Sequence, residues 1–265
     1  MAKYTIRPLN TGYTNIDKKT YLYHHSTHPY REVEGKVDVP CFAFLVEGGK
    51  ELVLVDTGTA DTERATKYHH PGSHQPPGFA IHERLAALDI KCEQIGLVIF
   101  THMHWDHIFY MDKFVNARFL ASRKEYDFAV NPIPIYHKSY EHPILGLRRP
   151  FEGIQIDLVD GEQEVVEGIR VFSSPGHSPG HQSVTIDTAE GRYICCGDAI
   201  FIYDNLDPVP EIHYGITPPA RYVNVVESWK SIVELKARAQ AKEFILPCHE
   251  PSLERRVEKK PILGR

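Results

Sequence analysis

A seven-residue segment, Thr-His-Met-His-Trp-Asp-His, holds the densest group of potential metal ligands in this chain. It directly follows the apolar run Leu97–Phe100, which is typical of a buried strand. In extended backbone, residues two positions apart point to the same side, so His102 and His104 can bind one metal ion together. Asp106 and His107 follow where we expect the chain to turn into a helix. Their side chains would then diverge by about 100° and could serve a second, neighbouring ion.

Three further candidate ligands lie downstream of this segment. His177 lies in a Gly- and Pro-rich loop, Asp198 ends a strand, and His249 follows the last strand. Because each carboxylate oxygen can bind a separate ion, Asp198 can bridge two metals. Imidazole and carboxylate ligands without thiolate suit zinc, iron, manganese or cobalt rather than a structural cysteine-rich site. The sequence therefore predicts a site for divalent metal ions, with zinc as the favoured metal.

Short apolar runs bounded by turn residues predict the β-strands that must position these ligands. The runs are Cys41–Val46, Leu52–Val55, Leu97–Phe100, Arg118–Ala121, Arg170–Phe172, Ser183–Ile186, Tyr193–Cys196 and Phe244–Leu246. Gly48-Gly49, between the first two, indicates a hairpin. Strands and helices together indicate an α/β protein whose sheets are covered by helices, rather than a strict βαβ alternation.

Three segments predict helices. Ile81, Leu85 and Leu88 recur at helical spacing, and Ser122 followed by Glu125 indicates a capping box. Thr217-Pro218-Pro219 predicts the start of a longer helix. Its expected buried face comprises Tyr222, Val226, Trp229 and Val233. The long segments His24–Pro40 and Asn131–Glu152 are rich in Tyr, His and Pro, and we expect them to form walls or a lid, or else plain surface loops.

Composition excludes several classes of function. The chain has 30 Lys and Arg against 35 Asp and Glu, so its formal net charge of -5 excludes a broad cationic surface for nucleic acid or anionic lipid. No apolar run is long enough to span a membrane, and the N-terminal segment lacks the apolar core of a secretory signal. The five cysteines contain no C-x-x-C pair, which fits reduced thiols. We therefore expect a cytoplasmic protein with a small-molecule substrate and no nucleic-acid or membrane partner.

The order of the candidate ligands, H-x-H-x-D-H followed by His177, Asp198 and His249, resembles the metallo-β-lactamase superfamily. Within it, the stretch from Pro175 to Ser183 is similar to the N-acyl-homoserine-lactonase-like group, and Val55-Asp56-Thr57-Gly58 resembles the turn that members place under the site. The resemblance implies one domain over residues 1–265 with an αββα sandwich, in which two facing mixed sheets are flanked by helices. It also implies two metal ions, one held by His102, His104 and His177, the other by Asp106, His107 and His249, with Asp198 shared.

The activity expected from this resemblance is hydrolysis that opens a lactone ring, of the acyl-homoserine type or another small lactone. A hydroxide that bridges the two metals would attack the carbonyl carbon. Asp198 and Asp106 are the catalytic candidates, because Asp198 would hold both metals and either Asp106 or a metal-bound water would return a proton to the leaving oxygen. Asp56 is a candidate acceptor that would fix a ligand imidazole, or simply a residue that caps the turn.

Substrate-binding candidates are Trp105, Phe109, Phe201, Tyr203 and Tyr136, which we expect to form apolar walls or to overhang the site. Many lactonases place a tyrosine three residues after the bridging aspartate, where this chain has Phe201, so Tyr203 could take over its role. Arg148 and Arg149 could bind a substrate carboxylate, although exposed arginines are commonly only solvated.

Other activities of the same fold remain open from the sequence. They are a glyoxalase-II-like thioesterase, a phosphodiesterase and an iron-dependent persulfide dioxygenase. The sequence does not distinguish a monomer from a homodimer.

Overall fold

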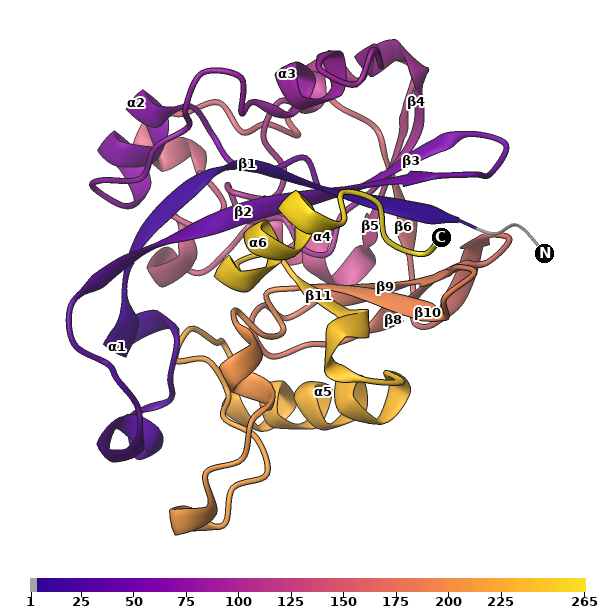
Figure 1. Ribbon diagram of the computed structural model, residues 1–265. Helices are drawn as coiled ribbons and strands as arrows, with labels where there is room; N and C mark the ends of the chain where they lie inside the picture. Colours follow the sequence, from indigo (N-terminus) through magenta and orange to yellow (C-terminus); the bar gives the residue numbers. More distant parts are fainter. Residues whose placement is uncertain (1–3) are drawn as a thin grey trace.

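A computed structural model describes residues 4–265 of the chain as two mixed β-sheets that face each other, with helices on the outer sides (Figure 1). The first sheet contains, in spatial order, β1 Thr5–Asp17, β2 Lys36–Glu47, β3 Leu52–Val55, β4 Ile95–Ile99, β5 Arg118–Ser122 and β6 Ile156–Val159. The second sheet contains β11 Ile245–Pro247, β10 Arg192–Gly197, β9 Gln182–Asp187, β8 Ile169–Ser173 and β7 Gln163–Val166. The predicted fold class is confirmed.

Each sheet combines antiparallel hairpins with parallel neighbours. Strands β1 to β3 pair antiparallel, whereas β3 to β6 pair parallel, so that β3, β4 and β5 end at the same edge of the sheet. In the second sheet, β7 to β10 are antiparallel and β11 runs parallel to β10. The start of β9 therefore lies beside the ends of β10 and β11.

The period-two pattern of the strands divides their side chains between two apolar layers. In β2, Phe42 and Phe44 face the space between the sheets, where they join Tyr193 of the second sheet. Ala43 and Leu45 face the outer side, where helices cover the first sheet. Both layers are fully buried, which is why these runs contain almost no polar residue.

The helices cover both outer faces. Helices α3 (Ile81–Ala86) and α4 (Arg123–Val130) pack with the outer side of the first sheet, and α5 (Val225–Arg238) packs on the second sheet (Figure 1). Helix α6 (Pro251–Lys259) contacts β2. Two short helices, α1 (Lys18–Tyr21) and α2 (Thr62–Arg64), lie in connections.

The structure contains three strands that were not predicted, β1, β6 and β7, and corrects one predicted helix. The sequence of β1, the longest strand, is TIRPLNTGYTNID, which contains few apolar residues and a proline. Helix α5 begins at Val225, not at Thr217, and Asn224 caps it through its side chain. Its buried residues include Ile232 and Leu235, whereas Val226 and Val233 of the predicted face are exposed, so the predicted face was wrong.

Two local expectations also differ in detail. Helix α4 begins after Ser122 as predicted, but the Ser122 side chain makes no capping hydrogen bond, and Glu125 points inward instead. The segment after His104 forms a turn rather than a helix. The long segments also carry short 3-10 helices, at His25–Tyr30, Pro134–Tyr136 and Pro143–Leu145.

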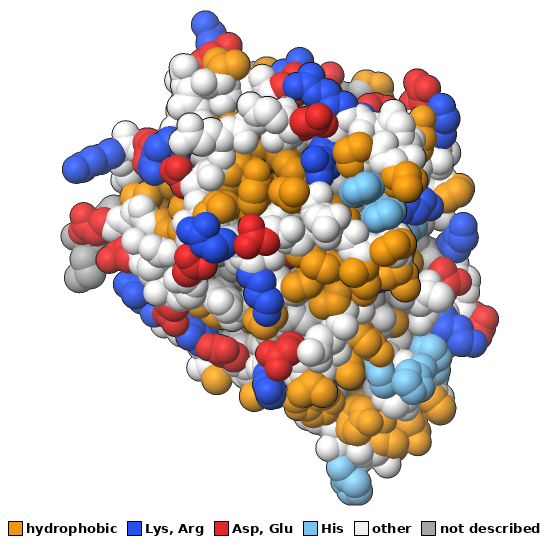
Figure 2. All heavy atoms as spheres, turned by 180° about the vertical axis from the view of Figure 1, so that it is seen from behind, with side chains coloured by type: hydrophobic (Ala, Val, Ile, Leu, Met, Phe, Trp, Pro, Cys, Tyr) orange, Lys and Arg blue, Asp and Glu red, His pale blue; other side chains and the backbone are white. Residues whose placement is uncertain are grey.

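The molecular surface mixes charges. Figure 2 shows acidic and basic side chains interspersed over the face opposite to that of Figure 1, while apolar and histidine side chains gather toward one side of it. Among residues 4–265, no helix combines the length and the apolar character needed to cross a membrane.

Candidate metal centre

The candidate ligands lie where the two sheets meet at one edge. His102, His104, Asp106 and His107 follow β4, while Asp198 follows β10 and His249 follows β11. His177 precedes β9, whose start lies at the same edge because β9 is antiparallel to β10. Parallel pairing of β10 with β11 brings the last ligand beside Asp198. The sheet topology therefore gathers residues that are distant in the sequence.

Three imidazoles form the first group. His104 Nδ1 lies 3.0 Å from His102 Nε2 and 2.9 Å from His177 Nε2. Nitrogen ligands of a tetrahedral zinc ion at about 2.0–2.1 Å lie roughly 3.3 Å from one another, close to this spacing. Burial lowers the pKa of His177 to about 4 and those of His102 and His104 well below the ordinary histidine value, so the rings are neutral near pH 7. Neutral rings can direct lone pairs at one ion.

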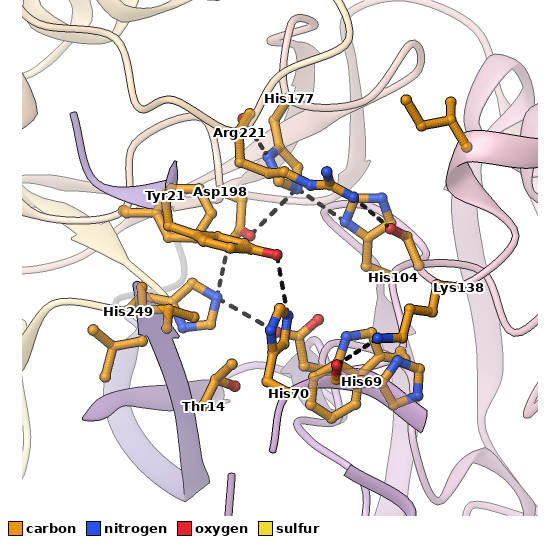
Figure 3. Close-up of a pocket in the computed structure, with 17 residues that line it drawn as sticks. Thr14, Tyr21, His69, His70, His104, Lys138, His177, Asp198, Arg221 and His249 are labelled. Atoms are coloured by element: carbon orange, nitrogen blue, oxygen red, sulfur yellow. Dashed lines mark hydrogen bonds and ion pairs between the residues drawn. The ribbon is translucent and has the colours of Figure 1, made fainter. Parts of the chain in front are cut away.

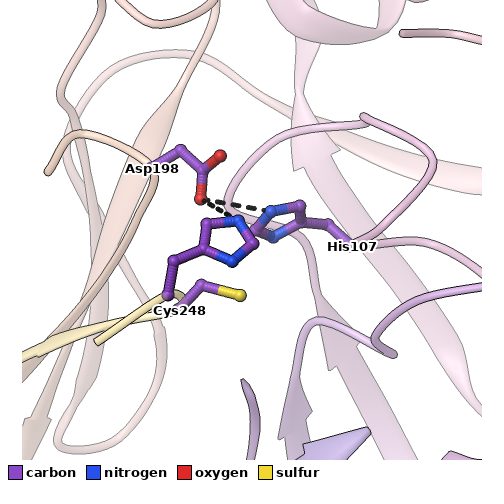
Figure 4. A group of neighbouring side chains, drawn as sticks. His107, Asp198 and Cys248 are labelled. Atoms are coloured by element: carbon purple, nitrogen blue, oxygen red, sulfur yellow. Dashed lines mark ion pairs between the residues drawn. The ribbon is translucent and has the colours of Figure 1, made fainter. Parts of the chain in front are cut away.

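A second group lies beside the first and includes His107 and Asp198, which Figure 4 shows. His107 Nε2 and His249 Nε2 lie 3.2 and 3.3 Å from Asp198 Oδ1, and His249 Nε2 lies 3.6 Å from Asp106 Oδ2. All of these side chains are buried, with Asp106 the most exposed at 7%. Two imidazoles and two carboxylates thus face one small space.

Asp198 belongs to both groups. Its Oδ1 faces His107 and His249, whereas its Oδ2 lies 3.3 Å from His177 Nε2 and 3.9 Å from His102 Nε2. Asp198 Oδ1 and His107 Nε2 are buried without a hydrogen-bond partner. Leaving such a group unsatisfied costs about 1–3 kcal/mol, and a bound cation would satisfy both atoms. The donor set and its orphaned atoms therefore fit two divalent metal ions.

Asp56 orients the ligand His107 from behind. Its Oδ2 accepts hydrogen bonds from His107 Nδ1 at 2.9 Å and from the Thr101 hydroxyl at 2.8 Å, while its Oδ1 accepts the Thr101 backbone N–H at 2.8 Å. The bond to Nδ1 leaves the other ring nitrogen, Nε2, directed at Asp198 and the centre. This is the placement expected for the acceptor role considered for Asp56.

Backbone carbonyls fix two other rings in the same way. His249 Nδ1 donates to the carbonyl of Pro40 at 2.8 Å, and His177 Nδ1 donates to the carbonyl of Arg221 at 3.1 Å. Both bonds leave Nε2 directed inward, toward the other candidate ligands.

Glu125 stabilises the loops that carry His102, His104 and His177, a role that the sequence did not indicate. Its Oε1 accepts hydrogen bonds from the Met103 N–H at 3.1 Å and the Tyr140 hydroxyl at 2.8 Å. Its Oε2 accepts from the Ser178 hydroxyl at 2.6 Å and the Gly180 N–H at 3.1 Å. Glu125 is 1% exposed and thus joins the two loops that carry the first three histidines.

His181 holds the backbone of Asp198. Its Nε2 accepts a hydrogen bond from the Asp198 N–H at 3.2 Å, and its Nδ1 lies 2.9 Å from the Ser174 hydroxyl. Gly197 turns the chain here with a positive φ of 47°, and a Cβ there would lie 2.5 Å from Thr101 Oγ1. Only glycine therefore lets the chain before Asp198 pass this close to Thr101.

Two thiols lie near the second group. Cys248 lies with His107, Asp198 and His249 within reach of one ion (Figure 4), but its thiol donates to the carbonyl of Phe42 at 3.3 Å. Burial raises the pKa of Cys248 to about 11, so it stays protonated near pH 7. Cys41 Sγ lies 3.8 Å from His249 Nδ1, on the outer side of that ring.

A cavity of about 400 Å³ opens directly over the two groups (Figure 3). Of the predicted substrate-binding residues, Trp105 and Phe201 line it. Trp105 stacks on His69 with ring centroids 4.0 Å apart, and Phe201 stacks on His249 at 5.1 Å. Both rings are buried and held in place.

The structure does not bring the other predicted aromatic residues to this cavity. Phe109 packs behind Trp105, and Tyr203 turns outward, where its hydroxyl donates to the carbonyl of Ile245 at 2.9 Å. Tyr136 packs with the outer core, and its hydroxyl donates to the carbonyl of Tyr222 at 3.3 Å. Since the chain turns into a 3-10 helix at Tyr203, its side chain does not follow the direction of Phe201.

Other polar residues line the cavity beside His69 and His70, and the sequence did not point to them. They are Thr14, Tyr21, Lys138, Ser139 and Arg221. Thr14 lies in β1 and the others lie in three separate connections, so no local motif marks them. Arg148, which the sequence suggested as a carboxylate ligand, lines a different depression on the surface, and Arg149 donates to the carbonyl of Val130.

Known proteins are similar to this chain in sequence. An N-acyl homoserine lactonase of Bacillus cereus is 27% identical over 184 residues, which cover 66% of this chain and 70% of the relative. The N-acyl homoserine lactonase AttM of Azorhizobium caulinodans is 25% identical over 220 residues, covering 77% and 78% of the two chains.

Solved structures share the fold. An N-acyl homoserine lactone hydrolase with the product N-hexanoyl-L-homoserine at its catalytic metal centre superposes with a TM-score of 0.74, at 20% identity over 97% of both chains. AidC, a dizinc quorum-quenching lactonase, has a TM-score of 0.67, at 16% identity over 95% of this chain and 89% of its own. A family model for the metallo-beta-lactamase superfamily matches residues 37–249. The chain therefore belongs to the metallo-beta-lactamase superfamily, and the predicted enzyme class, a metal-dependent hydrolase, is confirmed.

Proposed function

We propose that this protein is a dinuclear-metal-dependent hydrolase that opens the ring of a small lactone. The observation that carries the proposal is Asp198, whose two oxygens face two separate groups of imidazoles. The names of the relatives, N-acyl homoserine lactonases, support a lactone as the substrate. Zinc is the metal we favour, because the ligands are imidazole and carboxylate and because one structural neighbour is a dizinc enzyme.

His102, His104 and His177 would hold one ion, and Asp106, His107 and His249 the other, with Asp198 shared. Two divalent ions there would supply a nucleophile at neutral pH, by lowering the pKa of water, and would polarise an ester carbonyl.

The chain itself contributes positioning and proton transfer. Asp106 lines the cavity, and its carboxylate can take up a proton and deliver it to the alkoxide oxygen that leaves when the ring opens. Outside the centre, the bonds to Asp56, Pro40 and Arg221 hold the ligand rings in one orientation. The site is thus organised before the substrate arrives.

The cavity suits a substrate of modest size. A volume of about 400 Å³ lies within the range of small-molecule sites. The stacked rings of Trp105 and Phe201 offer apolar walls beside the centre. A lactone ring seated between them would present its carbonyl to the two metal groups.

We further propose that residues 1–265 act as a single catalytic domain in the cytoplasm. The cysteines Cys41, Cys92, Cys195, Cys196 and Cys248 are all free, which fits a reducing compartment.

A substrate panel on metal-replete protein tests the proposed function. The panel compares lactones, a thioester and bis(p-nitrophenyl) phosphate, and adds oxygen consumption with a persulfide. We expect lactone turnover that His104→Ala and Asp198→Ala abolish while far-UV circular dichroism stays native. His25→Ala, at an exposed histidine outside the cavity, is the matched control. Turnover of the phosphodiester, the thioester or the persulfide without lactone turnover would contradict the proposal.

A further inference from the structure

We propose that Arg221 and Lys138 form an anion-binding subsite in the cavity, so that the preferred substrates are lactones that carry a carboxylate. This inference rests on the proposed lactonase function and names its substrate class. Both side chains line the cavity together with the metal-binding groups (Figure 3).

The first observation is that these two cations lack acidic partners. Among residues 4–265, neither forms an ion pair with a carboxylate: Arg221 Nη2 donates to the Ser139 hydroxyl at 3.1 Å, and Lys138 Nζ donates to the carbonyl of His69 at 2.7 Å. Nearby Arg64, in contrast, forms a bidentate pair with the buried Glu141. Most N–H donors of the Arg221 guanidinium therefore remain available to a ligand.

The second observation is that the guanidinium is held in place. It lies 5.9 Å from the ring centroid of Tyr21 and 5.5 Å from that of Tyr136. Its loop is tied down on both sides, because the Ala220 N–H donates to the Tyr21 carbonyl at 3.0 Å and the Val223 N–H to the Gly176 carbonyl at 2.7 Å. A fixed planar fork of donors binds a carboxylate with little loss of side-chain entropy.

The third observation is the charge of the cavity. The chain carries a net charge of -5, yet the only carboxylates that line this cavity within residues 4–265 are Asp106 and Asp198, which both belong to the metal-binding groups. Two divalent ions would outweigh them, and Arg221 and Lys138 add further positive charge. A neutral substrate can only accept ordinary hydrogen bonds from these two cations, whereas a carboxylate also gains the attraction between opposite charges.

Tyr21 and His70 complete the polar wall. The Tyr21 hydroxyl lies 3.3 Å from His70 Nε2, and both residues line the cavity (Figure 3). Burial lowers the pKa of His70 to about 4, so this ring adds no positive charge near pH 7. The subsite charge therefore comes from Arg221 and Lys138.

A pair of probes that differ only in charge tests the subsite. They are 5-oxotetrahydrofuran-2-carboxylate and its carboxamide, assayed with metal-replete enzyme of verified metal content. We expect the wild type to favour the carboxylate, and Arg221→Ala to raise KM for the carboxylate about 10- to 100-fold while changing KM for the carboxamide less than about 3-fold. Lys138→Ala, at an exposed position, should raise KM for the carboxylate about 3- to 10-fold.

Controls separate this role from a structural one. Arg221→Ala keeps the backbone carbonyl that holds His177, and Arg221→Lys keeps the charge and should restore part of the carboxylate preference. Arg255→Ala and Lys113→Ala remove cations that do not line the cavity and should leave both KM values unchanged. Rising salt concentration should weaken the carboxylate preference.

Calorimetric binding of glutarate, with glutaramide as the neutral control, keeps the test independent of turnover. If the wild type opens neither lactone, the lactonase proposal fails, yet glutarate should still bind the wild type about tenfold more tightly than Arg221→Ala. Two outcomes would refute the anion subsite while the lactonase proposal stands. In one, the wild type opens the carboxamide as efficiently as the carboxylate. In the other, Arg221→Ala lowers kcat for both probes equally and leaves KM unchanged.

Discussion

Replacing Glu125 by glutamine tests whether one buried carboxylate holds the metal-binding loops together. Glu125 accepts two backbone N–H groups, from Met103 and Gly180, and two hydroxyl groups, from Tyr140 and Ser178. The glutamine amide keeps one oxygen and presents an NH2 group in place of the other. Whichever way it turns, one backbone N–H then faces a donor, because a backbone N–H cannot rotate away as a hydroxyl can.

The expected loss follows from these contacts. Hydrogen bonds to a charged group contribute about 1.5–3 kcal/mol each, and an unsatisfied buried donor costs about 1–3 kcal/mol. We therefore expect Glu125→Gln to lower the free energy of unfolding by about 3–5 kcal/mol, a large part of the stability of an ordinary domain. Since Met103 lies between His102 and His104, affinity for the first metal ion should fall as well.

Urea unfolding followed by circular dichroism measures the stability, and metal titration of the apo-protein measures the affinity. Asp127→Asn, at an exposed position on the same helix, is the matched control and should change stability by less than about 0.5 kcal/mol. If Glu125→Gln lowers the free energy of unfolding by less than about 1 kcal/mol and leaves the metal affinity unchanged, Glu125 does not hold these loops together.

Three other predictions concern the centre and its frame. Asp56→Asn removes the charged acceptor of His107 Nδ1 and should lower metal affinity about 10- to 100-fold in a competition titration with a chromogenic chelator; unchanged affinity would show that the ring needs no such partner. Gly176→Ala places a Cβ 2.3 Å from the backbone of Ser228 at a φ of +134°, so thermal unfolding should reveal a destabilisation of several kcal/mol, and a native-like melting temperature would be inconsistent with this packing. Removal of metal with EDTA should abolish hydrolysis and lower the melting temperature, and added zinc should restore both; activity that survives chelation would contradict metal dependence.

The sequence predicted most of the core strands, because burial on both faces leaves uninterrupted apolar runs such as those of β3 and β4. It did not predict β1, whose polar residues and Pro8 conceal a strand that pairs along its length with β2. Tertiary pairing, not local propensity, makes that segment extended.

Helix α5 shows a different limit. The Pro218-Pro219 pair is typical of a helix start, but the Pro218 carbonyl accepts the His24 N–H at 3.0 Å and keeps this segment in a loop against the N-terminal region. Asn224 then caps the helix. A contact with a residue far away in the sequence outweighed the local signal.

That the candidate ligands would lie together could be predicted, because their residue types are rare in combination and four of them are nearly consecutive. The cavity residues Tyr21, Lys138 and Arg221 could not, since they lie in separate connections and each alone is an ordinary surface residue type. Glu125 was noticed only as a possible helix cap, because nothing in the sequence shows which loops will fold against it.

Anomalous diffraction at the zinc edge from crystals of the zinc-loaded protein tests the central claim most directly. We predict two peaks about 3.5–4 Å apart, one beside His102, His104 and His177 and the other beside His107 and His249, with Asp198 between them. A single peak, or none beside Asp198, would contradict the proposed dinuclear centre.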